Sequence, residues 1–365
     1  MASFRKLANG NVQATVYVGR DTDGTQIREY VTCASKKDCK EAVREIEADI
    51  ANGNYSQMGR VRLVDWVEKW IELNRKILSP GTILIYKINL EAHYRPFFGE
   101  KKMKDITEVM VREFMALKLE TLNPNTVRKL VSVLNKMLRE ALRDKNPARF
   151  IKLPDKKDFT PYNVTDEDFE RIHTIVIGTI DEIFVLLSAW CGLRLGEICA
   201  LKPGDILKKQ CKITIDESLT KNDKHDHEYK SPKSKNGVRT IDISEYLMGL
   251  IQAYMKEKGS ISEKLFDYLP GSYTHRWIKI VTDNKLPHIR FHDLRHYHIS
   301  DMYDQGIKDK YAAKRAGDNP ETIRKIYQHL RESREDEMSN AFRNVRPGKK
   351  LELVPVKEEK KPDQA

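Results

Sequence analysis

Two separated arginine motifs and one tyrosine carry the chemistry of this sequence. Arg194 lies in Gly192–Glu197 (Gly-Leu-Arg-Leu-Gly-Glu), Arg295 lies in His292–His296 (His-Asp-Leu-Arg-His), and Tyr327 follows both. Two guanidinium groups can bind the oxygens of one phosphate, because each planar group makes paired hydrogen bonds and stays charged at any relevant pH. Histidines can move a proton and a tyrosine can act as a nucleophile. The set therefore predicts breakage of a phosphodiester without a metal.

Cleavage of DNA by direct attack needs help at three places on the phosphodiester. The nucleophile must lose a proton, the non-bridging oxygens must be neutralised, and the leaving 5′ oxygen must gain a proton. Tyr327 would be a poor nucleophile on its own, since the pKa of free tyrosine is about 10. Two adjacent guanidinium groups and a proton acceptor such as His292 ease formation of the phenolate.

Arg194 is expected at a tight turn between two helices. The apolar run 184–190 predicts the first helix, and a glycine in the turn lets the chain reverse before the second. Glu197 is expected to orient Arg194 or to fix the local structure. His296 and His298 are assigned a role in supporting the site rather than in catalysis.

Together these motifs resemble those of the tyrosine recombinases, the phage integrase family, over nearly the whole chain. His292–His296 matches the family's H-x-L-R-H box, Gly192–Glu197 matches its first arginine motif, and Tyr327 keeps the family's interval from Gly317. The resemblance implies that both arginines bind the scissile phosphate. It also implies that the first histidine of the box exchanges a proton with the tyrosine, which becomes bonded to the 3′ phosphate.

The resemblance places the leaving-group acid on a lysine between the two arginine motifs. Family members carry it on a β-hairpin, and residues 230–241 fit one, with a basic polar turn followed by an alternating strand. Lys235, just before Asn236, best resembles the catalytic lysine. Lys233 would face the same side of an extended strand, so it remains a competitor and is otherwise assigned to DNA binding.

Asp318 departs from the family pattern. The family usually has histidine, and sometimes tryptophan, at this catalytic position, where it hydrogen-bonds the scissile phosphate, whereas this chain has aspartate after Gly317. An ionised carboxylate would repel the phosphate. Asp318 therefore points away, is protonated, or orients a neighbouring arginine or histidine.

No cofactor or metal site is predicted. The five cysteines form no C-x-x-C pair, and their odd number fits reduced thiols in a cytoplasm. His225 and His227 are assigned to a solvated hairpin loop. The chemistry needs no nucleotide either, because the phosphotyrosyl bond conserves the energy of the broken phosphodiester.

The first 55 residues predict a small α/β unit. Alternation at 13–17 and 27–33 indicates strands, and Ser35 can cap a helix that ends near Asn52. A sheet this small has little core of its own, so we expect it to present a surface. The unit resembles the arm-type DNA-binding domain of phage and conjugative-element integrases.

A helical bundle follows in which basic charge is concentrated. Of the net charge of +11, residues 61–160 contribute +8, whereas residues 161–345 balance to zero. The helix beginning at Asn123 is expected to bury one apolar stripe and to turn basic side chains toward DNA phosphates. These candidate DNA-binding residues are Arg128, Lys129, Lys136, Arg139 and Arg143. The bundle resembles the family's core-binding domain.

The predicted fold class is mixed α/β and mainly helical, with small sheets. The expected domains are an arm-type DNA-binding domain (1–57), a helical core-binding domain (60–150), a proline-containing linker (151–162), a catalytic domain (163–346) and a disordered tail (347–365).

The whole pattern predicts a site-specific recombinase, namely the integrase of a phage or integrative element. By resemblance it acts as a homotetramer on double-stranded DNA at attachment sites, through a Holliday junction, with an excisionase and a host DNA-bending protein as candidate partners. No apolar run reaches the ~18–20 residues of a membrane span and no signal peptide is visible, so a bacterial cytoplasm is expected. A type IB topoisomerase, a chromosome-dimer resolvase and a non-catalytic DNA-binding protein remain alternatives.

Overall fold

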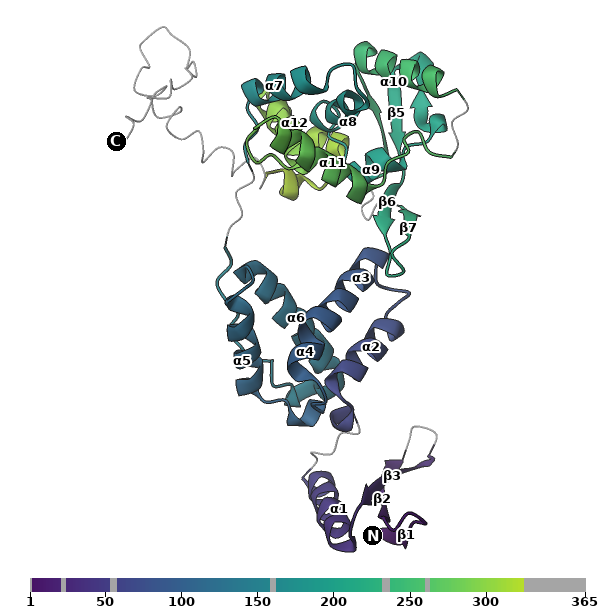
Figure 1. The fold of residues 1–365 in the computed structure, drawn as a ribbon, viewed down its shortest axis with the longest axis vertical. Coiled ribbons are helices and arrows are strands. Elements are labelled where there is room, and N and C mark those ends of the chain that lie inside the picture. Colours follow the sequence, from purple (N-terminus) through teal and green to yellow (C-terminus); the bar gives the residue numbers. More distant parts are fainter. Residues whose placement is uncertain are drawn as a thin grey trace, which may run out of the picture. The chain divides into compact units, whose positions relative to one another are not determined.

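The chain forms two compact units, Met1–Lys157 and Asp158–Ala365. The computed structural model describes residues 2–20, 24–52, 58–157, 162–231, 237–259 and 263–324. Figure 1 shows helices in both units and small antiparallel sheets, which confirms the predicted fold class.

The N-terminal part of the first unit is a three-stranded sheet with one helix packed on it (Figure 1). Its elements are β1 (Ser3–Lys6), β2 (Val12–Arg20), β3 (Gln26–Cys33) and α1 (Lys36–Ala51). The predicted cap is present, since the Ser35 hydroxyl accepts from the backbone N–H of Asp38 at 3.2 Å. The helix and one sheet face share a small core of Ala14, Val16, Cys39, Val43 and Ile46.

The opposite face of this sheet, which we call the open sheet face, is polar. Its residues are identified from the strand register, because alternate residues of a strand lie on one face and paired residues of neighbouring strands share that face. For example, Thr15 pairs with Tyr30 and Tyr17 pairs with Arg28. They are Ser3, Arg5, Gln13, Thr15, Tyr17, Arg20, Gln26, Arg28, Tyr30 and Thr32. Among these described residues the face carries three arginines and no carboxylate.

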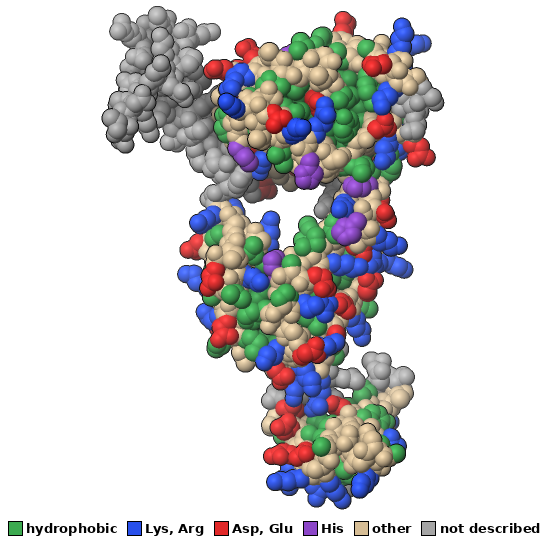
Figure 2. All heavy atoms as spheres, in the orientation of Figure 1, with side chains coloured by type: hydrophobic (Ala, Val, Ile, Leu, Met, Phe, Trp, Pro, Cys, Tyr) green, Lys and Arg blue, Asp and Glu red, His purple; other side chains and the backbone are tan. Residues whose placement is uncertain are grey.

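Residues 63–142 form the predicted helical bundle. Its helices are α2 (Leu63–Leu73), α3 (Pro80–Asn89), a π-helical turn (Leu90–Tyr94), α4 (Arg95–Phe98), α5 (Glu108–Leu119) and α6 (Pro124–Leu142). Asn123 caps α6, and the buried stripe of this helix is Val127, Leu130, Val131, Leu134, Met137 and Leu138. The face of the bundle visible in Figure 2 carries both basic and acidic side chains.

The second unit is built around α8 (Ile180–Ala189), in which every residue from Asp181 to Ala189 is buried. A helix that is apolar on most sides is stable only when other elements enclose it. The enclosing helices are α7 (Asp166–Val176), α9 (Leu195–Ala200), α10 (Glu245–Lys258), α11 (Pro270–Asp283) and α12 (Phe291–Asp304). The following helix, α13 (Asp309–Ala316), packs against α12 in a separate, smaller core cluster. Thr165 starts α7 with a capping box.

The described residues of this unit also form two small sheets. One has the strand order β4 (Ile206–Leu207), β5 (Lys212–Ile215), β8 (Arg239–Asp242), and the other is the hairpin of β6 (Ser218–Lys221) and β7 (His227–Lys230). The strand predicted after the basic turn is present as β8. Among the described residues, however, it pairs with β5 rather than with the strand before the turn, because β7 pairs with β6.

Candidate active site

Arg194 lies at the turn between α8 and α9 that the sequence predicted. It is the N-cap residue of α9, and the turn before it uses Gly192 at a φ of 68°. A Cβ atom at Gly192 would lie 2.6 Å from Cδ2 of His298, so the backbone conformation and the neighbouring imidazole both require glycine. The Arg194 side chain remains 35% exposed.

Arg295 is buried, with a side chain only 2% exposed. Its Nη1 donates to the carbonyl oxygen of Gly192 and, at 2.6 Å, to that of Ala316. These bonds join the turn before Arg194 to the end of α13. Burial and the nearby charge of Arg194 lower the pKa of Arg295 to about 10, so it is protonated at neutral pH.

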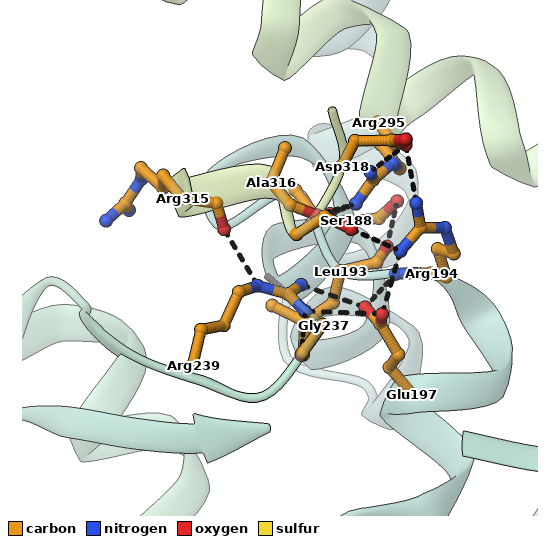
Figure 3. Close-up of polar contacts among 12 residues, drawn as sticks. Ser188, Leu193, Arg194, Glu197, Gly237, Arg239, Arg295, Arg315, Ala316 and Asp318 are labelled. Carbon is orange, nitrogen blue, oxygen red and sulfur yellow. Dashed lines mark hydrogen bonds and ion pairs between the residues drawn. The ribbon is translucent and has the colours of Figure 1, made fainter. Parts of the chain in front are cut away.

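Both arginines point at one carboxylate oxygen (Figure 3). Oδ2 of Asp318 lies 2.5 Å from Nη2 of Arg194 and 3.1 Å from Nη2 of Arg295. Of the three possibilities for Asp318, the structure therefore has the one in which it contacts the arginines. Two guanidinium groups from separate elements converge on a single anionic oxygen.

Glu197 holds Arg194 from the other side. Its carboxylate accepts from the backbone N–H of Arg194 at 2.9 Å and from Nη1 at 3.0 Å. Arg239 donates to the same carboxylate, from Nη2 at 2.9 Å and from Nη1 at 3.3 Å. Burial acts to raise the pKa of Glu197, but the hydrogen bonds and charge of Arg239, with those of Arg194, hold it below its usual range. Glu197 therefore stays ionised between two arginines.

The sequence reading missed Arg239. In β8, Arg239 and Ile241 are buried while Thr240 and Asp242 are exposed. The sequence does place Arg239 two residues before Ile241 on an alternating strand, so both side chains face the core. A charged side chain facing the core needs a buried partner, and this requirement could have identified Arg239 as part of the site.

His292 lies in the first turn of α12 beside His296, with ring centroids 4.8 Å apart. Although its side chain reaches solvent, desolvation of its inner side and repulsion from His296 and Arg295 lower the pKa of His292 to about 4. The imidazole is neutral at pH 7 and can accept a proton. Burial lowers the pKa of His298 to about 3, and its contact with Gly192 agrees with a supporting role.

Asp293, within the same motif, is the third residue of α12 and caps the start of this helix. Its carboxylate accepts from the backbone N–H of Arg290 at 2.8 Å and from Nε of Arg290 at 3.1 Å. The side chain is fully buried. This acid therefore fixes the start of the helix that carries His292 and Arg295.

Three predicted catalytic or DNA-binding residues, Lys233, Lys235 and Tyr327, lie outside the described residues. The chain is described on both sides of the two lysines but only on the N-terminal side of the tyrosine. Gly237 follows the lysines and leads into β8, and Asp318 precedes the tyrosine in the sequence.

The predicted DNA-binding side chains on α6, and that of Arg143 at its C-cap, differ in their surroundings. Arg128 is half-buried and donates to the carbonyl oxygen of Pro154. Lys136 lies over the ring of Trp70, 5.0 Å from its centroid. The exposed members are Lys129, Lys136, Arg139 and Arg143.

Within the described ranges, no cluster of three or more histidine, cysteine or acidic side chains is arranged to hold a metal ion. The cysteines are free thiols. The helices of the described part are too short or too polar to cross a membrane.

Residues 163–334 match the phage integrase family, and residues 62–119 match the phage integrase N-terminal SAM-like domain. A XerC-like tyrosine recombinase of Caldanaerobacter subterraneus is 25% identical, over 87% of this chain and 92% of its own length. The ICEBs1 integrase of Bacillus subtilis is 23% identical, over 93% of this chain and 98% of its own.

Solved structures share the fold. The Tn1549 transposon integrase in complex with a circular intermediate DNA superposes with a TM-score of 0.62 at 19% identity, over 75% of this chain and 99% of that one. A lambda integrase dimer bound to a core site gives 0.60 at 14% identity, over 97% of each chain. The two matched domains, together with the relatives that align over most of the chain, show that it belongs to the phage integrase family of tyrosine recombinases.

Proposed function

We propose that this chain recombines DNA at specific sites by cutting and rejoining it through a 3′-phosphotyrosyl intermediate. The observation that carries the proposal is the convergence of Arg194 and Arg295 on one oxygen of Asp318. A phosphate oxygen of DNA can take the place of that oxygen, because guanidinium groups bind carboxylates and phosphates through the same paired geometry. The arginines then neutralise charge that develops on the non-bridging oxygens.

The remaining roles follow from the chemistry of a phenol, an imidazole and an amine, those of Tyr327, His292 and Lys235. The Tyr327 oxygen attacks phosphorus, and the bond from phosphorus to the 5′ oxygen breaks. His292, neutral at pH 7, accepts the tyrosine proton. Lys235, with Lys233 as the competing candidate, gives a proton to the 5′ oxygen. Asp318 leaves the arginines when the phosphate arrives.

Attack by the 5′ hydroxyl of a partner strand reverses the step and restores the tyrosine. Two such exchanges pass through a Holliday junction and use four protomers on double-stranded attachment sites. A lambda integrase tetramer of similar fold binds a Holliday junction, and relatives named integrases support the integration and excision of a mobile element. An excisionase and a host DNA-bending protein complete the proposed partners, in a bacterial cytoplasm.

The proposed domains divide DNA binding between two parts of the first unit. Residues 1–57 bind arm-type DNA through the open sheet face, whose three arginines, glutamines and tyrosines suit phosphates and base edges. Residues 60–150 bind the core site, joined by the linker 151–162 to the catalytic domain 163–346. Residues 347–365 form the tail.

A DNA-binding protein without catalysis is the second candidate. The pairing of Asp318 with both arginines favours it, because this carboxylate already neutralises the groups that would bind phosphate. The two candidates differ in one product, a covalent bond between protein and DNA.

The test is a nicked duplex from which the cleaved strand end diffuses away, so that a covalent adduct accumulates. The duplex is selected from a random-sequence library by the wild-type protein. Wild type should form the adduct, whereas Tyr327→Phe should bind the DNA and form none. Tyr311→Phe, at an exposed tyrosine of α13, is the matched control. An adduct from Tyr327→Phe would contradict the assignment, and relaxation of supercoils by single protomers would favour a topoisomerase.

A further inference from the structure

Arg239 is a buried cation to which the mechanism above gives no role. Its side chain is 3% exposed. Besides its two bonds to Glu197, Nη1 donates to the carbonyl oxygen of Gly237 at 3.1 Å and Nε to that of Arg315 at 2.8 Å. A buried guanidinium is costly unless it is paired and hydrogen-bonded. The site is therefore built around this charge.

These bonds join three parts of the second unit, called the catalytic unit from here on, to one guanidinium group (Figure 3). The bond to Glu197 reaches the start of α9, where the same carboxylate holds Arg194. The bond to Gly237 holds the backbone that leads into β8, two positions after Lys235 in the sequence. The bond to Arg315 reaches the end of α13, shortly before Asp318.

Gly317 shows how closely the guanidinium is enclosed. Its φ is 69°, and a Cβ atom there would lie 2.5 Å from Nη1 and 2.8 Å from Cζ of Arg239. Glycine is required both by the left-handed backbone and by the guanidinium packed against it. The turn at Gly317, which places Asp318 beside Arg194 and Arg295, therefore packs directly against Arg239.

We propose that Arg239 is a positioning residue for strand cleavage, because it fixes Arg194, the backbone at Gly237 and the Gly317–Asp318 turn in one arrangement. Lys235 lies two positions before Gly237 in the sequence. The inference rests on the proposed function. Arg239 acts through its neighbours and leaves contact with the phosphate to Arg194 and Arg295. Catalytic groups held in a reactive geometry lose about 100-fold in rate for a displacement near 1 Å.

The first test is Arg239→Lys, which keeps a positive charge beside Glu197 but loses the planar fork. With the selected nicked duplex at saturating concentration, adduct formation should slow by about 100-fold. DNA affinity should stay close to that of wild type. An unchanged rate would overturn the proposal.

A 5′-thio version of the duplex separates positioning from general destabilisation. Its leaving group needs no proton, so it removes the requirement for a correctly placed lysine. Arg239→Lys should recover part of its rate on this substrate, whereas Arg194→Lys should not. An equal loss on the normal and thio substrates would overturn the proposal, because a purely structural defect does not depend on the leaving group.

Arg276→Lys is the matched control, since Arg276 also donates a two-pronged pair of bonds to a buried carboxylate, that of Asp181. It should keep the wild-type rate. If Arg239→Lys does not fold, Gly317→Ala displaces the same guanidinium and should show the same partial recovery. No adduct from wild type would overturn the proposed function and this inference together, whereas a wild-type adduct with an unaffected Arg239→Lys would overturn this inference alone.

Discussion

Two arginine-rich regions of this protein hold their charges in opposite ways. On the open sheet face Arg5, Arg20 and Arg28 are exposed, and their bonds go to uncharged acceptors on Gln13, Gly24 and Gln26. In the catalytic unit Arg239 and Arg295 are 3% and 2% exposed, and carboxylates and backbone carbonyls fix them. Both regions carry guanidinium groups, but only in the catalytic unit do buried contacts fix the positions of these groups.

This difference in burial suits the exposed arginines to DNA binding and the buried arginines to catalysis. Exposed cations attract DNA through a field that salt screens, and each contributes modestly. Buried cations in a low-dielectric site are held in place before the substrate arrives, so they stabilise a transition state without reorganising. Substitutions should therefore have large effects on rate in the catalytic unit and small effects on affinity at the sheet.

The largest effect is expected at Arg295. Arg295→Lys should slow adduct formation by about 10²–10³-fold through loss of one phosphate clamp. It should also lower the free energy of unfolding by about 1–3 kcal/mol, because the carbonyl groups of Gly192 and Ala316 lose a buried donor. Single-turnover adduct assays and thermal unfolding measure the two effects.

Arg194→Lys provides the comparison, since the Arg194 side chain is 35% exposed. It should slow the chemistry while leaving stability closer to wild type. Equal destabilisation by both substitutions would argue against a difference in structural role between the buried Arg295 and the partly exposed Arg194.

The next largest effect on the rate of adduct formation is expected for substitution of the lysine. Lys235→Ala should cleave normal DNA poorly and the 5′-thio substrate nearly as well as wild type, because sulfur leaves without a proton. The measurement is the ratio of adduct rates on the two substrates. Recovery by Lys233→Ala, without recovery by Lys235→Ala, would transfer the role to Lys233.

Asp318 allows a test in the opposite direction. Asp318→Asn removes the charge that competes with phosphate for Arg194 and Arg295, so adduct formation at limiting DNA should rise by about tenfold, equivalent to about 1.4 kcal/mol. Titration of rate against DNA concentration measures it. A lower rate at saturating DNA would instead mean that the carboxylate orients the arginines while DNA is bound.

Local signals predicted much of the fold. Ser35 and Asn123 cap the helices expected to begin there, because a cap depends on residues only a few positions away. β1 was not foreseen, since Phe4 is its one apolar residue. The partner of β8 was also missed, because strand pairing depends on contacts between distant segments.

The site shows the same boundary between local and distant information. The motifs indicated that Arg194 and Arg295 act together, and the structure brings both to Asp318. The direction in which Asp318 points, and the role of Arg239, depend on contacts that no motif contains. Glu197 and Arg239 are separated by 42 residues.

The smallest effects are expected at the open sheet face. Each phosphate contact contributes about 0.9 to the slope of log affinity against log salt concentration. If Arg28 contacts a phosphate, Arg28→Gln should reduce that slope by about 0.9 for arm-type DNA, without changing cleavage at a core site. Binding isotherms over a series of salt concentrations measure the slope.

Lys40→Gln is the matched control, because Lys40 is an exposed cation on α1, which packs against the opposite face of the sheet. It changes the net charge of the domain by the same amount as Arg28→Gln, so a general field effect would alter both slopes equally. A contact made by the open sheet face would alter only the slope of Arg28→Gln. Equal slopes for the two variants would assign the N-terminal charge to long-range attraction, and the sheet would then lose its proposed role in contacting DNA.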